Sequence, residues 1–292
     1  MWKKIKSLFE RSVHRAIDCD IVTQGAAIAF YTIFSIAPLL ILIISLASIF
    51  YSEEFIRGQV SEQLISFAGA ELTRGIQEYM EARRQSPESL FTTIIAIVMM
   101  IVGATTVINQ LKNVLNMIWE VQEVHIHSVW QILINRLISF GVIILLSILL
   151  ITSLLAESLF AVAIPFFQQF LPDFTLDAFK LVSQISTIIF AIAFFTLLFK
   201  ILPDVHAPWK DIFIGAIFTT ILFLAGKFLV GFFLTASGIG ATYKAAGSLV
   251  VFIIWVYYNI QIVLFGAIFT QVYTKMFGGN ITPYHFVSLE EQ

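Results

Sequence analysis

The sequence predicts an all-α integral membrane protein, a polytopic membrane bundle of six transmembrane helices, and three observations lead to this fold class. Of the 292 residues, 59% are hydrophobic and only 12% are charged, and the mean hydropathy is +0.90. A soluble domain usually carries about 25% charged residues, so this composition indicates a polytopic membrane protein. Long apolar runs recur along the chain, and residues 248–274 contain no formally charged side chain. That run exceeds the roughly 20 residues that cross a hydrocarbon core as a helix.

Six apolar segments are long enough to span a bilayer. They are residues 25–50, 90–108, 137–162, 179–202, 212–235 and 248–274. Six spans place both termini on the same side of the membrane. Lys and Arg are more frequent in the segments that would then lie inside, which favours cytoplasmic termini. We expect residues 1–292 to form a single integral membrane domain.

Residues 1–20 are expected to form a cytoplasmic interfacial helix. Trp2, Ile5, Phe9 and Val13 fall on one helical face, and basic residues occupy the remainder. Such a helix lies on an anionic leaflet with its apolar face in the headgroup region. A cleavable signal peptide is the alternative, but the apolar run that follows exceeds the roughly 7–15 residues of a signal-peptide core.

Residues 51–89 form the largest polar segment and are expected to lie at the external surface of the membrane. Their apolar residues form two amphipathic faces that are interrupted at Ala68-Gly69-Ala70. This pattern predicts short amphipathic helices after the first span.

The first span carries Tyr31, Ser35 and Pro38 on one helical face. Pro38 removes a backbone hydrogen bond and should kink the helix. The kink has two interpretations: a packing feature between helices, or the wall of a substrate cavity, where irregular backbone at membrane depth is tolerated.

The last span carries small and polar residues on one stripe, which should face other helices because lipid cannot satisfy an amide. The stripe consists of Ser248, Trp255, Asn259, Gly266 and Thr270, and residues 212–235 carry a similar one, Gly215, Thr219 and Gly226. Asn259 and Gln261 are either hydrogen-bonding contacts between helices or ligands of a substrate.

Two formal charges, Glu157 and Lys227, lie inside predicted spans. A charge in hydrocarbon costs at least about 2.5 kcal/mol on insertion scales and therefore usually faces protein or water. Their predicted depths permit an ion pair. Snorkelling of each side chain to the outer interface and a direct role with a substrate or proton are the alternatives.

Motifs in several segments resemble the YihY/virulence factor BrkB family of bacterial inner-membrane proteins, which once carried the label ribonuclease BN. The family's carboxy-terminal signature is matched by Thr242, Tyr243, Gly247, Trp255, Tyr257, Tyr258, Gly266 and Ala267. Lys244 and Ile268 depart from it, where the family commonly has Gly and Glu. Further matches are the block Gly25-Ala26-Ala27 with Tyr31, Ser35 and Pro38, the Asn116-x-x-Trp119 element, and residues 203–215 with Lys227. The resemblance implies a multi-pass protein of the bacterial plasma (inner) membrane.

Catalytic machinery is not visible in the sequence. His125-x-His127 is followed by Ser128-Val129-Trp130, so the dense His/Asp arrangement of metal-dependent nucleases is missing. Gly226-Lys227 lacks the upstream glycine and the following Ser/Thr of a phosphate-binding loop. One cysteine, Cys19, excludes an intrachain disulfide and a Cys-based zinc cluster. A formal net charge of −2 does not suggest a nucleic-acid partner.

We therefore expect a non-enzymatic, transporter- or flippase-like protein without cofactor or metal, which moves an amphiphile, a lipid-linked molecule or a small solute. Its partners would be membrane lipid and an unidentified small-molecule or lipid substrate. The candidate cavity residues are Tyr31, Ser35, Pro38, Glu157, Lys227, Trp255 and Asn259. One alternative is a structural or regulatory membrane protein that binds lipid or a partner without moving anything. Another is a membrane-associated ribonuclease, which rests only on the family's former label.

Overall fold

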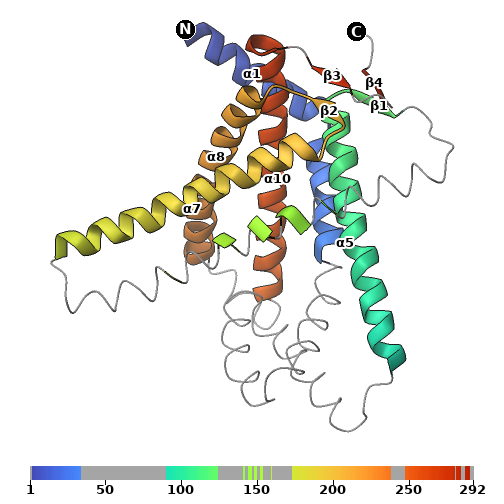
Figure 1. Ribbon diagram of the computed structural model, residues 1–292, viewed down its shortest axis with the longest axis vertical. Helices are drawn as coiled ribbons and strands as arrows, with labels where there is room; N and C mark the ends of the chain where they lie inside the picture. The colour runs from blue at the N-terminus through green and yellow to red at the C-terminus, as the bar shows by residue number, and fades with distance from the viewer. Residues whose placement is uncertain are drawn as a thin grey trace. The chain divides into compact units, whose positions relative to one another are not determined.

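The computed structural model describes residues 2–33, 90–123, 173–237 and 247–279, together with parts of 141–159 and 281–289. These residues are mostly helical (Figure 1). Three of their helices are long and apolar enough to cross a membrane, at Leu181–Ile201, Trp209–Gly226 and Phe252–Phe277. The predicted helical membrane class is thereby confirmed, and the count of six spans stays a prediction.

Long helices and very short strands make up the described chain. The helices are α1 (Trp2–Asp18), a shorter apolar helix (Ile21–Ile33), α5 (Leu90–Ile118), α7 (Asp173–Ile201), α8 (Trp209–Ser237) and α10 (Gly247–Phe277). The strands are β1 (Val121–Glu123), β2 (Val205–His206), β3 (Thr282–Pro283) and β4 (Val287–Leu289). β1 pairs antiparallel with β4, and β2 pairs antiparallel with β3. The segment after α10 is thus hydrogen-bonded to the loops that follow α5 and α7.

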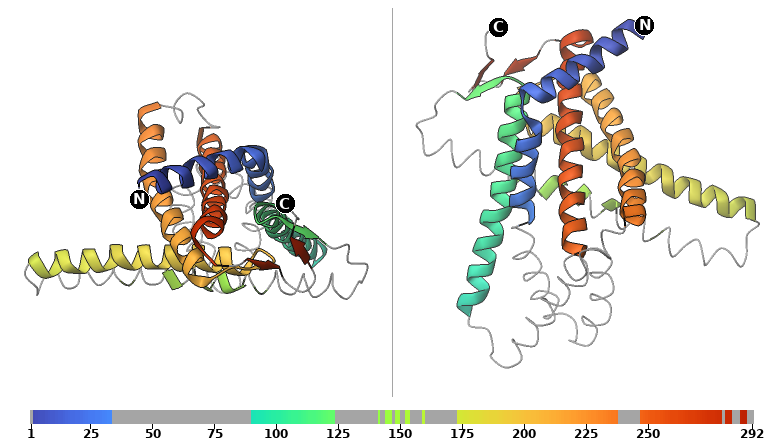
Figure 2. Two further views of the ribbon diagram at one scale, coloured as in Figure 1. Left: turned by 90° about the horizontal axis from the view of Figure 1, so that it is seen from above. Right: turned by 180° about the vertical axis from the view of Figure 1, so that it is seen from behind.

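Contacts divide the chain into two compact units. Unit 1 contains Met1–Ile21, Leu111–Leu224 and Ile262–Gln292, and unit 2 contains Val22–Gln110 and Ala225–Gln261. The helices α5, α8 and α10 each contribute to both units. Within unit 1, α1 lies across the C-terminal end of α10, as both views of Figure 2 show. The ring of Phe9 packs edge-on to Phe265 with centroids 6.1 Å apart.

The helix α5 is longer than predicted. The expected span ends at residue 108, but α5 continues to Ile118. The physical reason is a second apolar face: Leu115, Ile118 and Trp119 lie within one turn and are all buried. Trp119 is therefore a core residue of unit 1. The other long helices begin and end within a few residues of the predicted spans, with polar residues added at their ends.

The predicted helices at residues 1–20 and 25–50 are confirmed where they are described, as α1 and as the helix that begins at Ile21. The segment 51–89 lies outside the described residues, as does most of the predicted span 137–162.

The helices α8 and α10 interlock through two glycines and two threonines. A Cβ atom at Gly215 would lie 2.7 Å from Thr270 Cβ, and a Cβ atom at Gly266 would lie 2.9 Å from Thr219 Cβ. Each threonine hydroxyl donates to the carbonyl one turn earlier: Thr219 Oγ1 to Gly215 O at 2.8 Å and Thr270 Oγ1 to Gly266 O at 2.7 Å. The two helices therefore carry the same Gly-x-x-x-Thr pattern in opposite directions. We call Gly215, Thr219, Gly266 and Thr270 the Gly/Thr interlock.

Candidate functional site

Two glutamine side chains bond to each other in unit 2, and a third lies against the short helix that carries one of them. Gln110 Nε2 of α5 donates to Gln24 Oε1 at 3.3 Å, and Gln261 Nε2 of α10 donates to Val22 O at 3.5 Å. Gln261 lies directly over Gly25, where a Cβ atom would be 3.0 Å from its Cδ. We call Gln24, Gln110 and Gln261 the amide group. It connects the helix Ile21–Ile33 with α5 and α10 through neutral polar side chains.

The sequence drew attention to Gln261 but not to Gln24 or Gln110. Both lie at the edge of a predicted span: Gln24 directly precedes residues 25–50, and Gln110 follows residues 90–108. What the sequence lacked was the contact between them, which joins residues 86 positions apart.

The predicted cavity residues are only partly described. Tyr31 is exposed, and its ring packs edge-on against Phe30 with centroids 5.9 Å apart. Asn259 Nδ2 donates to Trp255 O at 2.6 Å, and Trp255 is 44% exposed. Lys227 lies in α8, where only its backbone is described. Ser35, Pro38 and Glu157 lie outside the described residues, so the cavity and the Glu157–Lys227 pair stay predictions.

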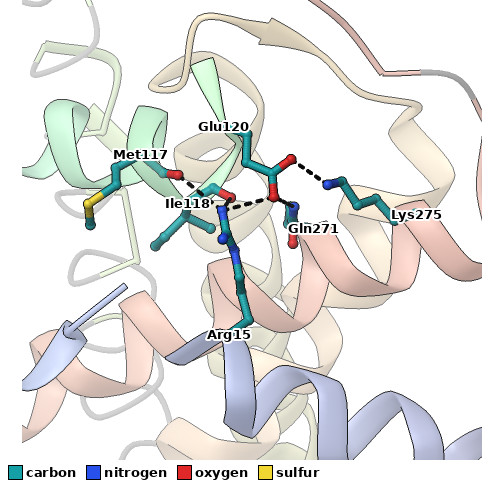
Figure 3. Close-up of polar contacts among 6 residues, drawn as sticks. All are labelled: Arg15, Met117, Ile118, Glu120, Gln271 and Lys275. Atoms are coloured by element: carbon teal, nitrogen blue, oxygen red, sulfur yellow. Dashed lines mark hydrogen bonds and ion pairs between the residues drawn. The ribbon is translucent and has the colours of Figure 1, made fainter. Parts of the chain in front are cut away.

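An ionic cluster joins α1, the end of α5 and the end of α10 in unit 1 (Figure 3). Arg15 Nη2 lies 2.9 Å from Glu120 Oε1, and Lys275 Nζ contacts Glu120 Oε2. Gln271 Nε2 donates to Glu120 Oε1 at 3.5 Å. The Arg15 and Glu120 side chains are only 26% and 15% exposed, so water weakens their attraction less than it would on an open surface. We call Arg15, Glu120, Gln271 and Lys275 the Glu120 cluster.

The cluster also caps α5. Arg15 Nη2 donates to Met117 O at 3.4 Å and to Ile118 O at 3.3 Å, two carbonyls of the last turn of α5. Met117 O also accepts from Glu120 N at 3.1 Å. Both carbonyls lie at the negative end of the helix dipole, so a guanidinium is favourable there. α1 is thus attached to both the backbone of α5 and the side chain that follows it.

Glu120 has a left-handed backbone, with φ of 59°. Glycine is the usual residue just past a helix end in this conformation, and a residue with Cβ costs about 1–2 kcal/mol. The three donors around its carboxylate explain why a glutamate occupies the position. Sequence reasoning missed this residue because a glutamate gives no local signal for a left-handed turn.

A second polar cluster in unit 1 joins α5 to the loop after α7. Asn116 Nδ2 donates to Asp204 Oδ2 at 2.9 Å, and Asp204 N donates to Asn116 Oδ1 at 2.9 Å. Lys112 Nζ lies 2.9 Å from the same Asp204 Oδ2. Asn116 is buried, at 3% exposure, and both the nitrogen and the oxygen of its side-chain amide are hydrogen-bonded, as buried polar groups require.

Among the described residues, no three His, Cys, Asp or Glu side chains are grouped so that they could hold a metal ion.

Comparison with known proteins places the chain in a family. The sequence profile of the family described as virulence factor BrkB matches residues 12–285, which is most of the chain. The chain belongs to the virulence factor BrkB family. This confirms the resemblance that the motifs indicated.

Relatives of this BrkB-family protein are known by name as membrane proteins. The UPF0761 membrane protein of Pseudomonas aeruginosa is 24% identical over 260 residues, which cover 87% of this chain and 60% of the relative. The UPF0761 membrane protein of Alcanivorax borkumensis is 24% identical over 272 residues, or 91% of this chain and 60% of the relative. The chain thus spans about three fifths of the length of these relatives. No solved structure matches it.

Several positions that match BrkB-family motifs now have a structural role. Gly25 makes room for the Gln261 amide, and Gly266 makes room for Thr219. Asn116 binds Asp204, and Trp119 fills the core of unit 1. The motif residues described here therefore hold helices and loops together.

Proposed function

We propose that this BrkB-family membrane protein is a non-enzymatic transporter that moves an amphiphile, a lipid-linked molecule or a small solute. The observation that carries the proposal is the amide group of unit 2. Neutral amides bind hydroxyl, carbonyl and phosphate groups without the desolvation cost of a full charge. A route through the membrane needs such groups on otherwise apolar helices.

The geometry of the amide group supports this role. An amide offers two donor hydrogens and two acceptor lone pairs, and the bond to Gln24 uses one of the four positions on Gln110. Gln24 and Gln110 are half-buried, so their remaining positions are accessible. Hydrocarbon cannot fill these positions, but water or the polar part of a substrate can. Asn259 and Trp255 add an amide and an aromatic face on α10, inside a candidate span.

Water access to Asn259 tests the polar route. In a Cys19→Ser background, Asn259→Cys should react several times faster with a membrane-impermeant thiol reagent than Ala267→Cys, a fully buried position on the same helix. The Cys19→Ser change removes the native thiol. That thiol is in any case a poor target, because burial raises its pKa and the thiolate is the reactive form. Equal protection of both positions would remove the basis of the proposal.

Movement of a probe tests transport directly. Vesicles containing the protein and a fluorescent phosphatidylglycerol should lose more than the outer-leaflet share of fluorescence when an impermeant reductant is added. Gln110→Leu should slow this loss, whereas Asn113→Leu, an exposed amide on the same helix, should not. Metal-dependent RNA cleavage by the purified protein would overturn the non-enzymatic assignment.

The alternative, a structural or regulatory membrane protein, is favoured by the Gly/Thr interlock. Its two threonines are fully buried, and a Cβ atom at either glycine would clash with the opposing threonine. Such close packing is typical of a rigid scaffold. If Asn259→Cys is protected from the thiol reagent and the fluorescent lipid does not move between leaflets, a structural or regulatory function is favoured.

We also propose six spans in the bacterial plasma (inner) membrane with both termini in the cytoplasm. Gln63→Cys and Gln122→Cys should then react with impermeant thiol reagents from opposite sides of the membrane. Gln63 belongs to the predicted external segment, and Gln122 lies in β1 just past α5. Labelling of both from one side contradicts this topology.

A further inference from the structure

The surface of α1 divides into three faces. Leu8 and Ser12 are buried against unit 1, and Ser12 Oγ donates to Leu8 O at 2.9 Å, so its hydroxyl needs no outside partner. The polar face carries Lys3, Lys4, Lys6, Arg11 and His14, all exposed. Between these two faces runs a row of large apolar side chains spaced four residues apart, Ile5, Phe9, Val13 and Ile17. We call this row the apolar stripe.

Each residue of the apolar stripe is at least partly exposed, although the Phe9 ring also packs edge-on to Phe265 of α10. The exposure ranges from 39% at Val13 to 70% at Ile17. A continuous exposed apolar row beside basic side chains is typical of a helix that binds a membrane surface. One part of the apolar side of α1 is buried against unit 1, and the stripe remains exposed and can bind another surface.

We propose that the apolar stripe docks on an anionic phospholipid surface, and that the Glu120 cluster fixes the rotation of α1 that turns the stripe to the lipid. Docking of the stripe does not depend on whether the protein transports anything.

Charge identifies the occupant as anionic lipid. Among the described residues, Lys3, Lys4 and Arg11 have no carboxylate within ion-pair distance, and Lys6 pairs only with Glu10 at 3.5 Å. Lys4 Nζ instead lies 6.0 Å from the centre of the Phe277 ring. Lys3 and Lys6 lie next to the stripe on the helix, whereas Lys4 and Arg11 lie on its far side. Lys3 and Lys6 would therefore meet the phosphates of a leaflet in which the stripe is inserted. A second copy of α1 would bring equally basic residues against them, which disfavours a dimer at this face.

The Glu120 cluster sets the orientation. Arg15 lies one turn from Ser12 on the buried side of α1, and it contacts Glu120, Met117 O and Ile118 O. Lys275 of α10 holds the same carboxylate, so Glu120 cannot follow a rotating α1 without losing a contact. While Arg15 keeps its contacts with Glu120 and the end of α5, the apolar stripe stays on the adjacent side of α1, and the helix cannot rotate to expose the stripe to water.

Fluorescence quenching in the full chain tests the docking. A fluorophore on Phe9→Cys, in a Cys19→Ser background in vesicles containing phosphatidylglycerol, should be quenched by lipids spin-labelled near the headgroup. A fluorophore on His14→Cys, on the polar face, should be quenched by aqueous iodide. Replacing phosphatidylglycerol by phosphatidylcholine or raising the salt concentration should weaken lipid quenching at Phe9. Equal lipid quenching at both positions overturns the docking, and so does loss of quenching on dilution with lipid, which would mean that a second copy covers the stripe.

The orienting role of Glu120 is tested in the same experiment. Glu120→Gln should reduce the difference between the Phe9 and His14 labels, and Arg15→Lys, which keeps the charge but not the fork of donors, should reduce it less. The matched control is Glu10→Gln, which removes the exposed pair with Lys6 on the same helix and should leave the difference intact. An unchanged pattern in both Glu120→Gln and Arg15→Lys overturns the assigned role of the cluster.

Discussion

Replacement of Gly266 by alanine should sharply lower the amount of folded protein in the membrane. The added Cβ would lie 2.8 Å from Thr219 Cγ2 and 2.9 Å from Thr219 Cβ, which is closer than real side chains approach. Thr219 is fully buried and its hydroxyl is bonded to Gly215 O, so it cannot turn away cheaply. The helices must separate instead, and overpacking of this kind costs about 1–3 kcal/mol or more. Packing is a main source of helix association in lipid, so the loss should show in the thermal midpoint in detergent as well as in abundance.

Two variants separate the interlock from a general effect of alanine. Gly141→Ala adds the same atom where no other atom lies within 4 Å, and it should be tolerated. Thr219→Gly in the Gly266→Ala background removes the opposing side chain and should restore part of the midpoint. If Gly266→Ala is as stable as Gly141→Ala, α8 and α10 do not pack through the interlock.

The sequence predicted the long apolar helices because hydrocarbon leaves few solutions: about 20 apolar residues in a row must form a helix with satisfied backbone. The stripe on α10 was predicted to face other helices, and this is confirmed at Gly266 and Thr270, which are buried against α8. Trp255 is 44% exposed, so for this part of the stripe the contact with another helix stays a prediction. In unit 2 it is Tyr258 that packs on α8, where a Cβ atom at Gly226 would lie 2.6 Å from its Cζ. The contact thus leaves the stripe, since the packed face of a straight helix drifts around its axis.

Residues of the two polar clusters could not be paired from the sequence. Asn116 and Asp204 are 88 positions apart, and Arg15 and Ile118 are 103 positions apart. Periodicity reports which face of a helix is buried, but it does not report which distant residue meets that face. For Asn116 the family motif identified the position without its partner. For the Glu120 cluster no motif was available. The role of Glu120 becomes visible only in the structure, where its three hydrogen-bond donors surround the carboxylate.

The Asn116→Asp variant should be strongly destabilised at neutral pH. The substitution keeps the shape of the side chain and the acceptor for Asp204 N–H, but it replaces the Nδ2 donor by a second carboxylate oxygen facing Asp204 Oδ2 at 2.9 Å. Lys112 offsets part of the repulsion, since its ammonium lies against the same oxygen. A buried site that loses a donor and gains a charge costs about 2–4 kcal/mol. The thermal midpoint in detergent at pH 7 measures it.

The loss should shrink as the pH falls, and this distinguishes charge repulsion from a packing defect. One proton shared between the two carboxyl groups removes the repulsion, so the folded variant binds more protons than the unfolded one and its stability rises as the pH falls. Asn113→Asp, on the exposed side of the same helix, should show neither the loss nor the recovery. The exchange Asn116→Asp with Asp204→Asn restores one carboxylate and one amide and leaves Lys112 one helical turn from the new carboxylate, so it should recover most of the midpoint. If the double variant is no more stable than Asn116→Asp alone, the contact between α5 and the loop after α7 does not depend on this pair, and the Asn116-x-x-Trp119 motif must act through Trp119.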